Sequence, residues 1–287
     1  MREKKLNYNK EDPNLNLDIL ENLLQDSTYK HNKKCLFLDI DGTLCDFKLD
    51  PNNCFIPNKT LNIIENIRAK DIPVIAITGR DIVSARELFK FMDIPIAALH
   101  GLEIYFNREK KNSLNKNLST ISYIHSMISK ACIPYPNLLI ENKKSSVALH
   151  YRKCPELEFV AKKIINESHS LFPELKLIEG KFVFELISAE ANKGFAIQKM
   201  LAHLNITDVF TPIFIGDDIT DEDGFTVVNK INNGISIKVG KGPTNAKYFL
   251  NDITQVQDFL ALFLKNIPTE ERVSTTDDLS GEEICLD

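Results

Sequence analysis

The chain of 287 residues has no long hydrophobic run and no basic cluster. No stretch approaches the ~20 apolar residues that a membrane-spanning helix needs, and the N-terminus mixes both charge signs without an apolar signal core. We therefore expect a cytoplasmic protein with no membrane partner. The missing basic runs also argue against a nucleic-acid partner.

Cysteine pairs with metal-binding spacing are also missing. The six cysteines, at positions 35, 45, 54, 132, 154 and 285, contain no CxxC pair. This absence argues against a zinc site made of thiolates. We expect reduced thiols in a reducing compartment, with a disulfide between Cys45 and Cys54 as the alternative.

Negative charge is concentrated at the C-terminus. The net charge is −5, and the last twenty residues hold seven acids and one arginine, so the rest of the chain is close to neutral. We expect a disordered acidic tail at 267–287 and an N-terminal extension at 1–33 that has one amphipathic patch. A hydrophobic content of 43% suits a globular body between them.

Short apolar runs alternate with helical patterns in two separate parts of the chain. In the first part, 34–106, the runs CLFLDI, PVIAIT and IAAL read as buried strands separated by amphipathic helices. The same rhythm returns at 186–266. This alternation predicts an α/β core with a parallel sheet covered on both faces.

The intervening residues, 107–185, follow a different pattern. A polar, loop-like stretch opens this part, and two hairpin-like strand pairs with alternating polar and apolar residues follow among amphipathic helices. We therefore expect an inserted α+β cap domain at 107–185.

Four polar clusters fall at predicted strand ends or helix starts. They are Asp39–Thr43, Thr78–Arg80, Lys193–Gly194 and Gly216–Asp218, the last with Asp221 close behind. Ligands of open parallel sheets bind at the carboxyl ends of the strands. We expect the four clusters to meet there and form one site.

Carboxylates brought together in this way repel one another unless a cation lies among them. Ligands that offer only oxygen favour a hard ion such as Mg²⁺. We expect Asp39 and Asp217 to bind it, with Asp218 or Asp221 as support through water.

Such a metal screens the charge between an attacking carboxylate and a phosphate dianion. Asp39 then suits the role of nucleophile, and Asp41 that of general acid and base. Thr78 offers a hydroxyl and nearby N–H groups for phosphate oxygens. Lys193 places a positive charge beside the phosphate and keeps Asp39 ionised.

Two levels of resemblance follow from these motifs. Four of them look like the signature motifs of the haloacid dehalogenase-like (HAD) phosphatases: DIDGT, TGR, NKG and GDDITDEDGF. Longer stretches resemble the trehalose-6-phosphate phosphatase family: ALHGLE, ENKKSSVALHYR, FELISAEANKG and FIGDDITDEDGFTVVN. The resemblance covers about 35–264.

The resemblance implies a Rossmann-like HAD core whose cap closes over a sugar. It also implies Mg²⁺-dependent hydrolysis of trehalose 6-phosphate to trehalose and phosphate through an aspartyl-phosphate, with a trehalose-phosphate synthase as a possible protein partner. The implied metal ligands are Asp39, Asp41 through its carbonyl, and Asp217. The implied phosphate-binding residues are Thr78, Gly79, Arg80 and Lys193. The implied sugar-binding residues are Glu141, Asn142, Lys143, His150, Arg152 and Glu185, with Lys144 as an alternative to Lys143.

Other interpretations stay open at this point. The substrate could be sucrose phosphate or a mannosyl-glycerate phosphate, the enzyme could be a mutase, or the chain could be a sugar-phosphate-binding regulator without catalysis. Locally, Asp41-Gly42 also fits a turn, Thr78 a helix cap, and Glu141 with Lys143 a solvated cross-strand pair. His100 fits a core histidine beside a turn.

Overall fold

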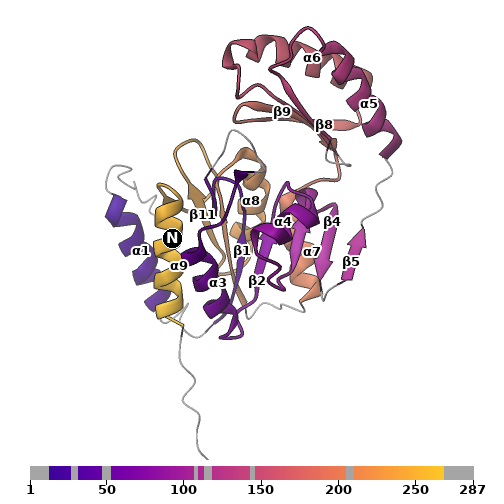
Figure 1. Cartoon of the computed structure of the whole chain (residues 1–287). Coiled ribbons are helices and arrows are strands. Elements are labelled where there is room, and N and C mark those ends of the chain that lie inside the picture. The colour runs from indigo at the N-terminus through magenta and orange to yellow at the C-terminus, as the bar shows by residue number, and fades with distance from the viewer. Residues whose placement is uncertain are drawn as a thin grey trace, which may run out of the picture.

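The computed structural model describes residues 13–26, 32–46, 53–106, 109–112, 118–142, 146–204 and 210–267. Figure 1 shows a larger body built on one sheet and a smaller body above it, which carries a second sheet. The expected acidic tail lies outside the described residues except for Ile267, and so do Lys143, Lys144 and Cys285. The same holds for 1–12 and 27–31 of the expected N-terminal extension.

The larger body contains an eight-stranded sheet in the order β12-β11-β10-β1-β2-β3-β4-β5. The six strands from β12 to β3 are parallel, whereas β4 and β5 continue the sheet antiparallel. The strands are β1 (Lys33–Leu38), β2 (Val74–Ile77), β3 (Ile96–Ala98), β4 (Glu103–Phe106), β5 (Glu109–Asn112), β10 (Phe210–Gly216), β11 (Ile235–Val239) and β12 (Tyr248–Leu250).

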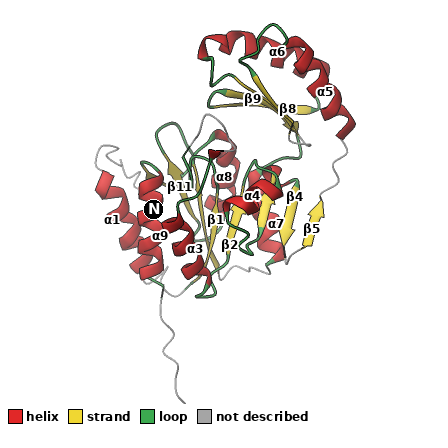
Figure 2. Cartoon of the chain, in the orientation of Figure 1, coloured by secondary structure: helices red, strands yellow, loops and turns green. Residues whose placement is uncertain are grey.

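Helices cover both faces of this sheet because the central strands are apolar on both sides. Along β1, Leu36 and Leu38 face one apolar cluster, and Cys35 and Phe37 face the other. The first cluster is covered by α1 (Pro13–Gln25), α3 (Asn58–Arg68), α4 (Ile82–Leu88) and α9 (Ile253–Lys265), and the second by α7 (Lys193–His203) and α8 (Glu222–Lys230). Figure 2 shows the resulting three layers of helix, sheet and helix.

The smaller body has a four-stranded antiparallel sheet in the order β6-β7-β9-β8. Its helices α5 (Leu118–Ala131) and α6 (Glu158–Leu171) pack on one face around a core of their own, and the other face is turned toward the larger body (Figure 1). The strands are β6 (Leu139–Asn142), β7 (Ser146–His150), β8 (Leu175–Gly180) and β9 (Val183–Ser188). The α/β fold class with a mostly parallel core sheet and a separate α+β unit is confirmed.

Two elements differ from the sequence-based expectation. The stretch from 107 was expected to be a loop, but Glu109–Asn112 pairs with β4 as the edge strand of the core sheet. The strand is hard to recognise in the sequence because its residues are strongly charged. Charged residues are typical of edge strands. In the expected N-terminal extension, α1 buries Leu20 and Leu24 in the same apolar cluster as α9.

The cysteines also correct an expectation. Cys45 and Cys54 are joined by a disulfide, which was the alternative to the reduced thiols that were expected. Their Cα atoms lie 6.4 Å apart, a distance that a disulfide spans and that a separation of nine residues does not reveal in the sequence. Cys35, Cys132 and Cys154 are free and buried.

Among the described residues, no helix is both long enough and apolar enough to cross a bilayer.

Candidate active site

A buried lysine joins the carboxyl ends of two neighbouring strands. Asp39 follows β1, Lys193 begins α7, and Asp221 ends the short 3₁₀ turn Ile219–Asp221 that follows β10. The Lys193 ammonium lies 2.8 Å from Asp39 Oδ1 and 2.7 Å from Asp221 Oδ1. All three residues are at most 4% exposed. The N-terminus of a helix disfavours a cation, and these two carboxylates offset that cost.

Burial and neighbouring charges shift the pKa values of Lys193, Asp39 and Asp217. Burial alone would lower the pKa of Lys193, but the attraction of Asp221 and Asp39 outweighs it and raises the pKa above its usual value. Burial raises the pKa of the Asp39 carboxyl well above its usual range, and Asp221 and Asp217 add to that shift while Lys193 opposes it. Burial, followed by the charges of Asp221 and Asp218, raises the pKa of Asp217 to about 7.

The site suits a hard cation. Carboxylate oxygens of Asp39, Asp217 and Asp221 lie within 4.8 Å of one another. Asp217 Oδ1 is buried and has no hydrogen-bond partner among the described residues. An orphaned buried carboxylate oxygen beside two other carboxylates fits an Mg²⁺ ligand, because such an oxygen otherwise costs free energy.

Local backbone geometry holds these acids in place. Asp221 Oδ2 accepts hydrogen bonds from the backbone N–H groups of Asp217 (3.0 Å) and Asp218 (2.9 Å). Gly42 has φ +82°, and a Cβ there would lie 2.0 Å from Asp217 Oδ2. Only glycine permits both this conformation and this close approach.

The Asp41 side chain is held by an arginine from the next strand end. Arg80 donates two hydrogen bonds to it, from Nε to Oδ2 (2.7 Å) and from a terminal nitrogen to Oδ1 (2.6 Å). Burial lowers the pKa of Arg80, but the hydrogen bond and charge of Asp41 outweigh burial and raise it. Sequence reasoning placed both residues in the site, but it did not reveal this pair.

Of the three phosphate-binding residues expected after β2, two line the cavity and one does not. Thr78 is fully buried and is not among the residues that line the cavity, and its hydroxyl accepts the N–H of Arg80. The N-terminus of α4 is already capped, because Asp81 accepts the N–H groups of Val83 and Ser84. Gly79 and Arg80 line the cavity directly.

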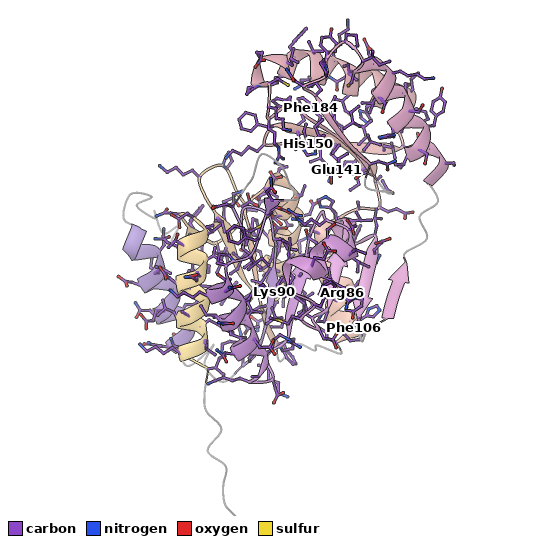
Figure 3. The ribbon with its side chains drawn as sticks, in the orientation of Figure 1. Arg86, Lys90, Phe106, Glu141, His150 and Phe184 are labelled. Atoms are coloured by element: carbon purple, nitrogen blue, oxygen red, sulfur yellow. A yellow bond between two sulfur atoms is a disulfide. The ribbon has the colours of Figure 1, made fainter. Side chains whose placement is uncertain are left out.

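The smaller body closes the cavity from the other side. Figure 3 shows Glu141 and His150 on the sheet face that is turned toward the core. His150 Nε2 lies 2.9 Å from Glu141 Oε2, and His150 Nδ1 lies 3.3 Å from a terminal nitrogen of Arg152. The Ser146 hydroxyl donates a hydrogen bond to the buried carboxylate of Glu185. The cavity is lined from the core by Asp39, Asp41, Gly79, Arg80, Lys193 and Asp217, and from the smaller body by Glu141, His150, Arg152 and Glu185. Asn142 is exposed and does not line it.

Sequence reasoning missed one charged residue of the site. Lys238 lies on β11, next to Gly216 across the strand pair, and is 6% exposed. Its ammonium donates a hydrogen bond to the backbone carbonyl of Asp217. A lysine inside the apolar run ISIKV is a detectable signal, because lysine is rarely buried without a partner.

Known proteins resemble this chain over most of its length. Residues 37–254 match the family model for trehalose-phosphatase. The chain is 30% identical over 247 residues to trehalose-6-phosphate phosphatase of Escherichia coli K12, which covers 86% of this chain and 92% of that protein. It is 31% identical over 243 residues to trehalose-phosphate phosphatase B of Arabidopsis thaliana, and the match spans 78% of this chain and 64% of the plant protein.

Solved structures show the same fold. The C-terminal domain of trehalose-6-phosphate phosphatase from C. albicans superposes with a TM-score of 0.78 at 23% identity, over 87% of this chain and 97% of that one. From the match to the family model and these relatives, we conclude that the chain belongs to the trehalose-phosphatase family of the HAD superfamily and is a phosphoric monoester hydrolase.

Proposed function

We propose that the protein hydrolyses trehalose 6-phosphate to trehalose and phosphate, with Mg²⁺ as cofactor and an aspartyl-phosphate intermediate on Asp39. The observation that carries this proposal is the buried group of Asp39, Lys193 and Asp221, with Asp217 beside it, at one end of a cavity whose other wall is the cap. The family supplies the substrate, since relatives are named for trehalose 6-phosphate.

In the first step, an Oδ atom of Asp39 forms a bond to phosphorus, and the bond from phosphorus to the sugar oxygen breaks. Asp41 gives a proton to that leaving oxygen. In the second step, Asp41 takes a proton from water, whose oxygen attacks phosphorus and releases phosphate from Asp39.

Asp39, Asp217 and the Asp41 carbonyl would hold Mg²⁺. When bound, Mg²⁺ supplies positive charge that lets a carboxylate approach a phosphate dianion. Lys193 holds Asp39 in position at 2.8 Å and contributes its own positive charge. Asp221 organises the site through Lys193 and two backbone N–H groups.

Arg80 must change partner during turnover. Its guanidinium donates to both oxygens of Asp41 and so fixes the carboxyl group that has to turn toward the leaving oxygen. Phosphate oxygens offer Arg80 the same bidentate geometry as a carboxylate. We propose that the phosphate of the substrate binds the Arg80 guanidinium and thereby releases the Asp41 carboxyl group.

Sugar recognition falls to the unit that spans 118–188, which we propose to be a cap domain. Glu141, Arg152 and Glu185 present charged groups to the cavity, and His150 lies between the first two. Sugar hydroxyls donate to carboxylates and accept from guanidinium groups, so this set suits a polyhydroxylated ligand.

The test is phosphate release from a panel of sugar phosphates, each with Mg²⁺ and with EDTA. The panel contains trehalose 6-phosphate, sucrose phosphate, a mannosyl-glycerate phosphate and glucose 6-phosphate. We expect kcat/KM to be highest for trehalose 6-phosphate and EDTA to abolish release. Asp39→Asn should bind this substrate without turnover, and turnover by Asp39→Asn would refute the covalent route.

A further inference from the structure

His100 lies in the turn Leu99–Gly101 that follows β3, and the mechanism above gives it no role. It is 7% exposed, and it lines the active-site cavity. We propose that His100 is a substrate-contacting residue of the phosphate site, whose imidazole N–H donates a hydrogen bond to a phosphate oxygen. This inference rests on the proposed phosphatase function.

The backbone of this turn is unusual. Leu99 has φ 51°, His100 has φ 54° and Gly101 has φ 95°, so three consecutive residues are left-handed. Residues other than glycine avoid this region, and leucine gains nothing from it locally. Conformations of this kind persist where the surroundings over-determine them, and they cluster at functional sites.

Three backbone hydrogen bonds hold the turn against both phosphate-binding segments. The His100 N–H donates to the Thr78 carbonyl (2.9 Å), and the Leu99 N–H donates to the Arg80 carbonyl (3.0 Å). The Asn192 N–H, directly before Lys193, donates to the His100 carbonyl (2.9 Å). The strained turn thus sets the imidazole in a defined position relative to both segments.

The imidazole packs on the glycine of the phosphate loop. A Cβ at Gly79 would lie 2.7 Å from His100 Nε2 and 2.9 Å from Cε1, so any larger residue at 79 would displace the ring. His100 and Lys193 also both line a second, adjoining cavity, together with Ile178 and Thr220. The ring therefore lies at the core end of the cavity, beside Gly79, rather than on the sheet of the cap.

The choice of residue fits a contact with phosphate. A neutral imidazole carries one N–H in either tautomer and a protonated one carries two, so the ring has an N–H to offer in every protonation state. A packing role on Gly79 would need no polar atoms. In this proposal the imidazole joins Lys193 and Arg80 as a donor to the phosphate and adds affinity for that end of the substrate.

The experiment compares two replacements that tolerate left-handed backbone. His100→Gly removes the side chain, and His100→Asn keeps an N–H donor on a shorter one. The control is Asn233→Gly, because Asn233 is also left-handed (φ 61°) and lines neither cavity. For each variant, calorimetry measures the Kd of inorganic phosphate in the presence of Mg²⁺, assays measure KM and kcat for trehalose 6-phosphate, and urea unfolding checks the fold.

We expect His100→Gly to raise the Kd of phosphate about tenfold or more, the effect of one hydrogen bond to a charged group, and to raise KM as well. His100→Asn should fall between His100→Gly and wild type, and Asn233→Gly should match wild type. In a ¹⁵N spectrum of histidine-labelled protein, phosphate should shift the His100 resonance.

Wild-type phosphate affinity in a folded His100→Gly variant would overturn the inference, and so would an unshifted His100 resonance. Such a result would leave the proposed function intact as long as the wild type releases phosphate from trehalose 6-phosphate. If the wild type binds phosphate through His100 but hydrolyses no member of the sugar-phosphate panel, the inference stands and the proposed function fails.

Discussion

Asp221→Asn is the sharpest test of the buried network. Asp221 Oδ1 accepts from Lys193 at 2.7 Å, and Oδ2 accepts two backbone N–H groups. Asparagine offers only one acceptor oxygen. Whichever way its amide turns, the NH₂ group meets either the Lys193 ammonium or the N–H groups of Asp217 and Asp218, and donors then face donors in a fully buried place.

The expected cost follows from these contacts. Breaking a buried ion pair by removing one charge costs about 3–5 kcal/mol. Asp221 also repels Asp39 and Asp217, since its charge raises the pKa of both, so its removal gives some relief. We therefore expect the lower end, about 3 kcal/mol. This is a large part of a typical stability of about 5–15 kcal/mol.

The assay is urea unfolding of metal-free protein at pH 7, read by circular dichroism. The matched control is Asp252→Asn, the same replacement at the exposed N-cap of α9, where the side chain accepts the N–H groups of Thr254 and Gln255. Asparagine caps helices about as well as aspartate, so the control should change stability by less than about 0.5 kcal/mol. If Asp221→Asn lowers the free energy of unfolding by less than about 1 kcal/mol, the network of Asp221, Lys193 and Asp39 does not hold the site together.

Three further predictions concern pH, the arginine pair and the disulfide. Because the pKa of Asp217 is raised to about 7, native metal-free protein binds a proton that the unfolded chain has lost above about pH 4. Its stability should therefore fall as pH rises from about 4 to about 7, and saturating Mg²⁺ should remove this slope; a slope of opposite sign in thermal melts would contradict the assignment. Arg80→Lys should lower kcat/KM for trehalose 6-phosphate by about tenfold or more, because a lysine cannot replace the two parallel hydrogen bonds, and unchanged kinetics would rule out the exchange of partners. Cys45→Ser with Cys54→Ser should reduce stability by at most about 3 kcal/mol, and dithiothreitol should change unfolding of the wild type but not of this variant.

Much of the fold and the chemical end of the site could be predicted from the sequence. Apolar runs that end in Asp39, Thr78 and Asp217 predict parallel strands whose carboxyl ends meet, and the structure joins Asp39 to Lys193 across 154 positions. Strand-end motifs carry this information because a parallel sheet places all such ends at one edge.

The sequence did not settle which side chains pair. The Arg80–Asp41 pair depends on the spacing of β1 and β2, and the Cys45–Cys54 bond depends on how close the fold brings the two Cα atoms. The polar strand Glu109–Asn112 was missed for a related reason, because backbone pairing with β4 defines it and its sequence, EKKN, has no apolar alternation. Tertiary context overrides local strand preference in such cases.

The charges of the site imply that metal and phosphate depend on each other. Asp39, Asp217 and Asp221 face two buried lysines, Lys193 and Lys238, so the group is negative when all five are ionised. A phosphate dianion alone would meet net repulsion there, whereas a divalent cation reverses the sign of the group. We therefore expect phosphate to bind at least tenfold more weakly with EDTA than with Mg²⁺. Calorimetry on wild-type protein in both conditions measures this difference. Equal affinities would mean that the carboxylates are protonated without Mg²⁺, so that no metal is needed to offset their charge.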